Sequence, residues 1–245
     1  MSRIDNVKEF SIRIYNEKDV NDYLIHDSIG KMIGDSYSEK QEMLTCDKWM
    51  TNSPAKRLIF YDMYGDILRD NKSKLRNVAD IGGGLSCLSK KLATNNNYTL
   101  VDPLVHDSKC DVVNMKNKMK DFIHLAGDWS SVNLSSYDIM ISNDLFPNVD
   151  QRMKEFFIDA SRRTSQLRIL LTAYNNNRSY MVKRTDADEY LNYLAWDGAQ
   201  ILFTLNFLGF EISEQDSKII EGSLPELYGN KRLVFLMVVN FDKGS

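Results

Sequence analysis

The chain is poor in cysteine and proline and has no long hydrophobic run, and each shortage excludes a class of protein. Its 245 residues include 3 cysteines and 4 prolines. Cys46, Cys87 and Cys110 lack the spacing of a disulfide framework or a zinc site, so we expect a reducing, cytoplasmic setting. The longest apolar run, Leu233–Val239, is far shorter than the roughly 20 residues of a membrane-spanning helix. Because the N-terminus is also polar, we expect no signal peptide and no membrane partner.

An excess of positive charge is also missing. Lysine and arginine together number 31, against 34 aspartates and glutamates, which gives a formal net charge of −3. Surfaces that bind nucleic acid need clustered basic residues, so we expect no nucleic-acid partner. Hydrophobic residues make up 43% and charged residues 27% of the chain, an ordinary balance for a folded domain. The length suits one α/β domain with an extension or two small domains, and a homodimer stays open.

The sequence changes its pattern near residue 76. Residues 1–76 have helical apolar spacing, with Ser53-Pro54 as a helix start, and predict an N-terminal helical cap. Residues 77–245 alternate strands with helices, which predicts a mostly parallel sheet. The last two predicted strands are about 15 residues apart, so we expect an antiparallel final strand. The expected fold class is therefore α/β, with a Rossmann-like seven-stranded sheet. A helix is predicted to end at Gly209, because glycine commonly caps the C-terminus of a helix. The predicted strands lie at 77–82, 97–103, 121–128, 137–144, 166–174, directly after Gly209, and at 231–241.

The stretch VADIGGGLSC at 78–87 has the form of a cofactor-binding turn. Three consecutive glycines, Gly82–Gly84, let the backbone turn sharply and approach a ligand closely. A nicotinamide or flavin dinucleotide motif would need a glycine where Cys87 stands, and a phosphate loop would need a later Gly-Lys pair that is missing. S-adenosylmethionine (SAM) carries an ammonium and a sulfonium. These positive groups suit the carboxylate of Asp80 at the strand end, directly or through water.

Acidic residues also end the next two predicted strands. Asp102 lies 20 residues after Gly82, where a carboxylate accepts hydrogen bonds from both ribose hydroxyls. Dinucleotide enzymes share this feature, so Asp102 alone does not identify the cofactor. The sequence AGDW after the third strand adds Asp128, for the adenine amine, and Trp129, for the adenine ring or a backbone contact. Acids at the ends of three successive strands suit a nucleoside joined to an amino acid.

The order VADIGGGLS, YTLVDP, LAGDW and YDIMISNDLF resembles the class I SAM-dependent methyltransferases over about residues 76–241. The resemblance implies SAM as the cofactor and S-adenosylhomocysteine (SAH) as its product. It implies that the first motif holds the methionine part, the second the ribose and the third the adenine. A third glycine is common in that family where Ser86 stands, and serine is small enough to fit. The expected cofactor-binding residues are Asp80, Gly82, Gly83, Gly84, Ser86, Asp102, Pro103, Asp128, Trp129 and Asn143.

Candidate catalytic residues lie at the carboxyl end of the fourth predicted strand, which in the family that the sequence resembles faces the transferred methyl group. Methyl transfer from a sulfonium is an in-line displacement, so the enzyme mainly aligns the acceptor and excludes water. A base helps when the acceptor is a hydroxyl, because the pKa of a hydroxyl is far above 7. Asn143 and Asp144 are the polar residues placed for this, with Asp144 as base or orienting group, or simply as a helix-entry carboxylate. His26 is an alternative base if the N-terminal segment covers the site.

The segment NDLFPNVDQRM together with RILLTAYNNN resembles sugar O-methyltransferases of bacterial capsule and surface-polysaccharide clusters. This resemblance implies O-methylation of a small sugar-linked or phosphorylated metabolite, with O-methyl phosphoramidate formation as one candidate. The fifth predicted strand ends in Tyr174-Asn175-Asn176-Asn177 without an acid, so we expect no metal. Three alternatives stay open: a SAM-binding protein without activity, an N-methyltransferase of a small amine, and a nicotinamide oxidoreductase.

Overall fold

The structure is a computed structural model, and its residues group into two compact units. The Asp144 unit consists of Met1–Glu17, Asp138–Arg184 and Asp188–Ser245. The glycine-loop unit is built mainly from Lys18–Tyr137. The residues that the structure describes are 3–37, 43–69, 75–117, 119, 122–183, 190–222, 227 and 232–242.

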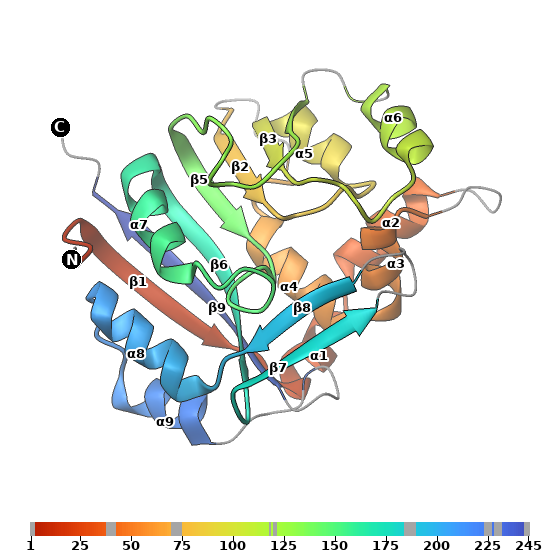
Figure 1. Cartoon of the computed structure of the whole chain (residues 1–245). Helices are drawn as coiled ribbons and strands as arrows, with labels where there is room; N and C mark the ends of the chain where they lie inside the picture. Colours follow the sequence, from red (N-terminus) through yellow and green to blue (C-terminus); the bar gives the residue numbers. More distant parts are fainter. Residues whose placement is uncertain are drawn as a thin grey trace. The chain divides into compact units, whose positions relative to one another are not determined.

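Seven strands form one sheet in the order β1-β9-β6-β5-β2-β3-β4, and β7 and β8 form a separate two-stranded sheet (Figure 1). The large sheet is mostly parallel with one antiparallel strand, which confirms the predicted Rossmann-like fold class. The strands are β1 Val7–Ile14, β2 Asn77–Ile81, β3 Asn97–Val101, β4 Ile123–Leu125, β5 Tyr137–Ser142, β6 Thr164–Tyr174, β7 Arg178–Lys183, β8 Tyr190–Ala195 and β9 Arg232–Phe241.

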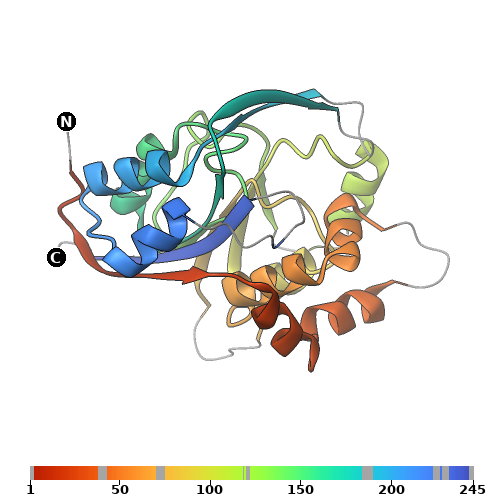
Figure 2. The ribbon, with the colours of Figure 1, turned by 90° about the horizontal axis from the view of Figure 1, so that it is seen from below.

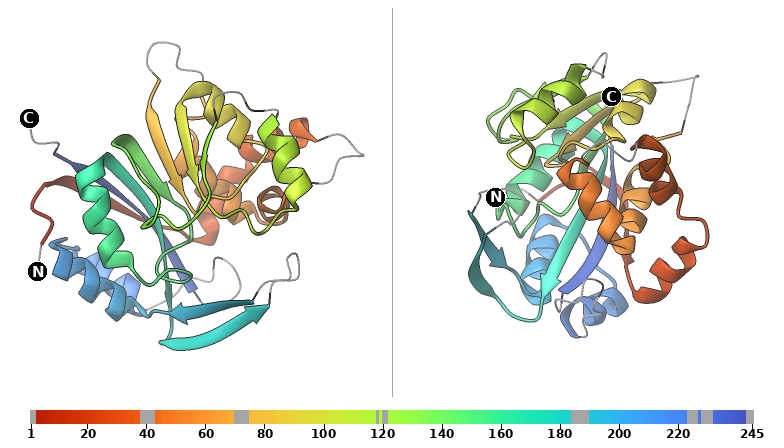
Figure 3. Two further views of the ribbon diagram at one scale, coloured as in Figure 1. Left: turned by 45° about the horizontal axis from the view of Figure 1, so that its top comes forward. Right: turned by 90° about the vertical axis from the view of Figure 1, so that its right-hand side faces the viewer.

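The glycine-loop unit contains three parallel strands, β2, β3 and β4. In β2 and β3, every residue after the first is buried, as expected for strands covered on both faces. Helices α2, α3 and α4 pack on one another (Figure 3, right, orange tones). The predicted start of α4 is confirmed, because Ser53 Oγ accepts from the Lys56 amide at 3.3 Å and Pro54 takes the first helical position. The helices are α1 Glu17–Leu24, α2 Ser28–Ser36, α3 Thr45–Asn52, α4 Pro54–Tyr64, α5 Ser89–Asn95 and α6 Lys109–Asn117.

The Asp144 unit is organised around β9, which is antiparallel to both of its neighbours, β6 and β1. Figure 2 shows β1 (red) beside β9 (blue). Helices α7 (Met153–Arg163) and α8 (Gly198–Leu208) both contact β6, and α9 (Glu214–Gly222) packs on α8. The predicted end of α8 is confirmed, since Gly209 has a φ of 100° and caps the helix in the left-handed conformation.

The N-terminal segment differs from its predicted helical character in one element, because Val7–Ile14 forms β1. In VKEFSIRI the half-buried Phe10, Ile12 and Ile14 alternate with exposed residues, which is the period of a strand with one covered face. The helices begin only at Glu17. The domain boundary at residue 76 and the role of residues 1–76 as a cap stay predictions.

The strand predicted directly after Gly209 is wrong, and β1 takes the seventh place in the sheet instead. Residues 210–213 are not extended into a sheet, and α9 follows them. Phe210 is 1% exposed, and its ring meets those of Phe10 and Phe157 edge-on, each with centroids 5.4 Å apart. The apolar signal at this position therefore comes from packing between elements and not from strand pairing.

The β7–β8 hairpin was not anticipated from the sequence. The two strands pair in antiparallel register from Arg178 opposite Ala195 to Lys183 opposite Tyr190. Tyr180 and Tyr193 stack across the pair with centroids 5.4 Å apart and planes 13° apart. Such cross-strand aromatic pairs stabilise an isolated two-stranded sheet, which is marginal by itself. Figure 3 (left) shows the hairpin as a separate ribbon that follows β6.

Candidate functional site

The three consecutive glycines form a tight turn at the carboxyl end of β2. Gly82 and Gly84 have φ values of 70° and 66°, a region that residues with a side chain rarely adopt. The Gly82 amide donates to the Val101 carbonyl at 2.8 Å, which extends the pairing of β2 with β3 by one residue. The turn therefore starts at the point where two parallel strands end side by side, which is where open α/β sheets bind ligands.

Asp80 lies beneath this turn and is 3% exposed. Its Oδ1 accepts from the Tyr64 hydroxyl at 3.0 Å and its Oδ2 from the Tyr98 hydroxyl at 2.7 Å. A Cβ added to Gly83 would lie 2.3 Å from Asp80 Oδ1, so the backbone at Gly83 covers the carboxylate closely. Burial raises the pKa of Asp80 to about 7, against the two tyrosine hydrogen bonds that lower it. Asp80 thus supports the turn from below, and its predicted contact with a cofactor stays a prediction.

Asp102 connects the glycine turn to the segment that follows β3. It is 4% exposed; its Oδ2 accepts from the Gly84 amide at 3.0 Å and its Oδ1 from the Leu104 amide at 2.7 Å. His124 holds the same segment, because its Nε2 lies 2.7 Å from the Asp102 carbonyl oxygen. A carboxylate has about four acceptor positions, so Asp102 keeps capacity for further donors. The sequence predicted the glycine turn and Asp102 as two separate motifs, and the hydrogen bond between them is seen only in the structure.

The other predicted cofactor residues of this unit differ in exposure. Ser86 is 4% exposed, and its amide donates to Ser89 Oγ at 3.1 Å, so it begins the turn into α5. Pro103 is exposed. Asp128 is exposed and accepts from the Ser130 amide at 2.8 Å, whereas Trp129 is 7% exposed. Pro103 follows β3 and Asp128-Trp129 follow β4, so both belong to the same edge of the parallel strands as the glycine turn.

Helix α3 lies directly on the glycine turn. Cys46 Sγ is 3.9 Å from the Gly83 carbonyl oxygen. At the start of the helix, the Thr45 amide donates to Asp107 Oδ1 at 2.8 Å, and Thr45 Oγ1 donates to the His106 carbonyl oxygen at 3.0 Å. Part of the N-terminal segment is therefore bound to both the loop after β2 and the loop after β3. None of these contacts was visible in the sequence.

Replacing Gly84 by alanine is expected to destabilise the protein. The left-handed conformation costs a residue with a side chain about 1–2 kcal/mol, and a Cβ at Gly84 would lie 2.4 Å from Cys46 Sγ. Urea unfolding should show a loss of at least that size for G84A. Adding Cys46→Ala in the double variant relieves the clash but not the strain, so it should recover part of the loss. A G84A variant as stable as the wild type would contradict the turn geometry.

Asp144 is surrounded by three polar side chains of its own unit, those of Thr172, Asn148 and Arg232. Thr172 Oγ1 donates to Asp144 Oδ1 at 3.0 Å, and Asn148 Nδ2 donates to the same oxygen at 3.5 Å. Arg232 Nη1 lies 3.8 Å from Asp144 Oδ2. Asp144 has a φ of 59°, an uncommon conformation outside glycine that clusters at functional sites. Its side chain is 27% exposed, so the carboxylate is held in place yet accessible.

The sheet explains why these residues meet. Thr172 lies near the carboxyl end of β6, and Tyr174 at that end pairs with Arg232 at the start of β9, because the two strands are antiparallel. Asp144 follows the end of β5 by two residues. The loop after it is anchored by Phe146, which is fully buried and stacks on Phe156 of α7 with centroids 4.4 Å apart.

The buried polar atoms near this cluster that have no hydrogen-bond partner among the described residues include Ser142 Oγ, Asn148 Oδ1 and Trp196 Nε1. Ser142 ends β5 two residues before Asp144, and Asn148 already contacts Asp144. Trp196 accepts from the Tyr174 amide through its carbonyl oxygen at 2.8 Å. Buried polar groups are rarely left unsatisfied, and such atoms beside an accessible carboxylate are typical of a site that takes a polar ligand.

The two remaining candidate catalytic residues stay predictions. Asn143 is half-buried beside Asp144 in the Asp144 unit. His26 belongs to the other unit, on the exposed turn after α1, where its ring lies edge-on to Tyr23 and Tyr61 with centroids 5.3 and 5.9 Å away. The aromatic contacts give His26 a structural role that is independent of any catalytic one.

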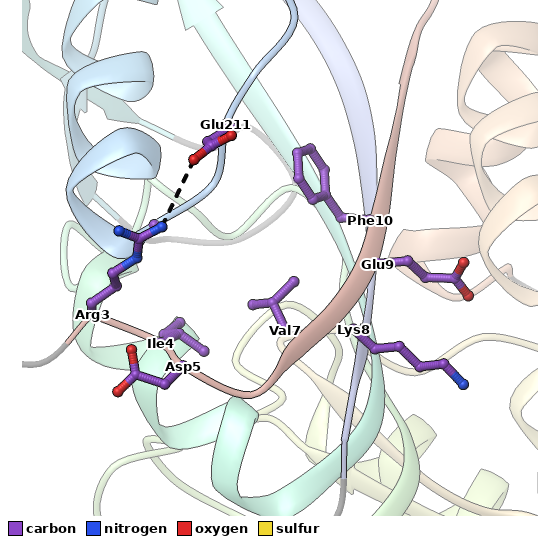
Figure 4. A pocket seen from close by; sticks show the side chains of 9 residues that line it. Arg3, Ile4, Asp5, Val7, Lys8, Glu9, Phe10 and Glu211 are labelled. Atoms are coloured by element: carbon purple, nitrogen blue, oxygen red, sulfur yellow. Dashed lines mark ion pairs between the residues drawn. The ribbon is translucent and has the colours of Figure 1, made fainter.

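A surface hollow of about 660 Å³ lies along the N-terminal residues of the Asp144 unit (Figure 4). Arg3 and Glu211 face each other across it at 3.9 Å, with side chains that are 64% and 91% exposed. None of the predicted site residues lines this hollow. Exposed ion pairs of this kind contribute little energy, and we assign the hollow no function.

No family model matches the chain. A curated relative, the shikimate dehydrogenase (NADP(+)) of Methanococcus aeolicus, is 26% identical over 151 residues, which cover 59% of this chain and 52% of the relative. The chain therefore spans about half the length of this relative. In the described part of the chain, every helix is too short or too polar to cross a lipid bilayer.

Solved structures of similar fold include several methyltransferases. Magnesium protoporphyrin IX methyltransferase from Synechocystis PCC 6803, with bound SAM, is 16% identical with a TM-score of 0.46 over 91% of this chain and 97% of that chain. The 1,6-didemethyltoxoflavin-N1-methyltransferase of Burkholderia thailandensis is 11% identical with a TM-score of 0.49 over 91% and 87%. A SAM-dependent methyltransferase from Clostridium acetobutylicum is 12% identical with a TM-score of 0.45 over 91% and 98%. At these identities and scores the likeness concerns the fold alone.

Proposed function

We propose that the protein is a SAM-dependent methyltransferase. The observation that carries the proposal is the hydrogen bond between the glycine turn and the acid after the next strand. Asp102 accepts from the Gly84 amide at the ends of two parallel strands. The left-handed φ of Gly84 lets its amide point at the acid, and Asp102 is an acceptor for ribose hydroxyls. The acidic side chains at this turn, Asp80 and Asp102, suit a cofactor that carries positive charge. SAM supplies, when bound, a methyl group on a sulfonium, which is an electrophile that needs no further activation.

The acceptor side of the proposal rests on Asp144. Its carboxylate is held by Thr172 and Arg232 while remaining partly exposed. A carboxylate in this state would accept a hydrogen bond from an acceptor hydroxyl, orient its oxygen and take its proton. The acceptor oxygen would take the methyl group from the sulfonium of SAM, with the methyl–sulfur bond breaking and SAH leaving as the thioether. Arg232 adds a positive charge at the same place, which suits an acceptor that carries a phosphate. We therefore place O-methylation of a small sugar-linked or phosphorylated metabolite first.

The sequence resemblance extends this to capsule or surface-polysaccharide biosynthesis, with O-methyl phosphoramidate formation included. The test is transfer of a labelled methyl group from SAM to a panel of nucleotide-sugars, sugar phosphates and phosphoramidates, with small amines as the competing acceptor class. Labelled product from the oxygen acceptors supports the proposal. Transfer to amines alone would make the protein an N-methyltransferase, and no transfer together with tight SAH binding would favour a binding protein without activity.

A nicotinamide oxidoreductase is the second candidate, since the curated relative is an NADP(+) dehydrogenase. Asp102 argues against NADP(+), because an acid at the end of the second strand of the motif repels a ribose 2′-phosphate, for which such enzymes use an arginine. Calorimetric titration with SAH and with NADPH separates the two candidates. Binding of SAH alone supports the methyltransferase, and binding of NADPH alone would overturn it.

Replacing Asp102 by alanine is expected to weaken SAH binding at least tenfold, roughly the cost of one lost hydrogen bond between a carboxylate and a buried ligand hydroxyl. Because the ribose is common to both ligands, 5′-methylthioadenosine should lose affinity to a similar extent. Asp111→Ala is the matched control, since Asp111 lies on α6 and accepts from Ser108 Oγ at 2.6 Å. Calorimetry that gives unchanged SAH affinity for D102A would remove the ribose assignment.

A further inference from the structure

Asp47, on α3, lies against the end of the glycine loop and is fully buried, with 0% exposure. Its Oδ2 accepts from the Cys87 amide at 2.8 Å and from the Tyr37 hydroxyl. The preceding residue, Cys46, contacts Gly83 and Gly84. Two successive residues of α3 therefore touch the loop at both ends, from the glycines to the residue where the chain turns into α5.

Three buried carboxylates thus border the loop, and their oxygens differ in one respect. In Asp80, each oxygen accepts from a tyrosine hydroxyl. In Asp102, each oxygen accepts from a backbone amide. In Asp47, Oδ1 is buried and has no geometrically defined hydrogen bond among the described residues, and the Cys87 thiol beside the carboxylate is only a weak donor. A buried carboxylate oxygen without a donor is costly, and in native proteins such an atom commonly has a ligand, ion or water as its missing partner.

We propose that Asp47 binds the α-ammonium of the amino-acid part of SAM through Oδ1. The inference rests on the proposed function and deepens it, because it reassigns the anionic partner of the ammonium from Asp80 to a residue of the N-terminal segment. An ammonium is a cation with three donors, so it satisfies both the charge and the vacant acceptor of a buried carboxylate. Asp80 is less suited, since Gly83 covers it and both of its oxygens are engaged.

The assignment also gives α3 a definite place in cofactor recognition. Asp102 accepts a hydrogen bond from the loop at the Gly84 amide, and Asp47 accepts one at the Cys87 amide, three residues further along. A ligand with ribose hydroxyls at one end and an ammonium at the other is matched by two carboxylates that contact the same loop three residues apart. A nucleoside without an amino-acid part would use only Asp102.

The test compares two ligands on the full chain, SAH and 5′-methylthioadenosine, which has the adenosine and thioether but no amino-acid part. Asp47→Asn keeps the size of the side chain and an oxygen that accepts from the Cys87 amide. We expect D47N to lower SAH affinity at least about tenfold, the lower range for a lost charge-assisted contact, and to leave 5′-methylthioadenosine affinity within about twofold. Asp107→Asn, on the segment that holds the start of α3, is the matched control and should leave the ratio of the two affinities unchanged.

A wild-type measurement keeps the inference testable if D47N fails to fold. The wild type should bind SAH at least about tenfold more tightly than the deaminated analogue that keeps the carboxylate but lacks the ammonium. Equal affinity for those two ligands overturns the inference alone. Equal loss of SAH and 5′-methylthioadenosine affinity in a folded D47N also overturns it. That result would mean that Asp47 stabilises the loop and does not bind the ammonium. Absence of binding of either ligand to the wild type overturns the proposed function itself.

Discussion

Replacing Asp144 by asparagine is expected to lower the turnover number by about 100- to 10,000-fold, the range for loss of a general base. Asparagine keeps the shape and can still accept from Thr172, but it cannot take a proton from an acceptor hydroxyl. The affinity for SAH should change little, because Asp144 is assigned to the acceptor and not to the cofactor. The measurement is steady-state methyl transfer to the acceptor found in the screen, together with calorimetry for SAH.

Two further variants interpret that result. Asp150→Asn removes the same charge from the same loop, where Asp150 accepts from the Arg152 amide at 2.9 Å, and should keep turnover within a few-fold. Thr172→Val removes the donor to Asp144 and should lower turnover without changing SAH affinity, because Thr172 acts by positioning Asp144. Normal turnover of D144N would contradict the assignment of Asp144 as base. Equal losses of turnover in D144N and D150N would mean that the loop requires its negative charges for structure and not for proton transfer.

The sequence predicted those parts of the fold that depend on local signals. Ser53-Pro54 and Gly209 were found because caps act within a few residues. The alternation of Phe10, Ile12 and Ile14 was also local, yet the surrounding polar residues hid it in a segment dominated by helical patterns. The place of β1 beside β9 could not be predicted, since it depends on pairing between the two ends of the chain.

The same limit applies to the candidate site. The glycine turn, Asp102 and Asp144 were predicted because each follows a strand end, a place that the strand pattern fixes. Arg232 was missed because its approach to Asp144 depends on the antiparallel direction of β9. Asp47 and Tyr64 lie on helices where one acid or one tyrosine has no sequence signal, and only the packing of α3 and α4 on the loop reveals them. Residues that act across elements therefore needed the structure.

Asp80 should make the stability of the protein without cofactor decrease as the pH rises from 4 to 8. Burial raises the pKa of Asp80 from 3.8 in an exposed chain to about 7 in the folded one. Between these two values the unfolded state loses its proton while the folded state keeps it, so the folded state binds more protons and the free energy of unfolding falls with rising pH. Above about pH 7 both states are ionised, and the full loss, up to about 4 kcal/mol, has been reached.

Asp80→Asn removes this titration, and its amide can still accept from one tyrosine hydroxyl and donate to the other. We therefore expect the difference in unfolding free energy between D80N and the wild type to shift in favour of D80N by up to about 4 kcal/mol from pH 4 to pH 8. Urea unfolding at both pH values measures it. Asp66→Asn is the matched control, because Asp66 pairs with Arg76 at 2.5 Å with a side chain that is 44% exposed, and an exposed pair contributes little. Parallel pH curves for D80N and the wild type would mean that Asp80 is ionised at an ordinary pKa. In that case it would again compete with Asp47 for the cofactor ammonium.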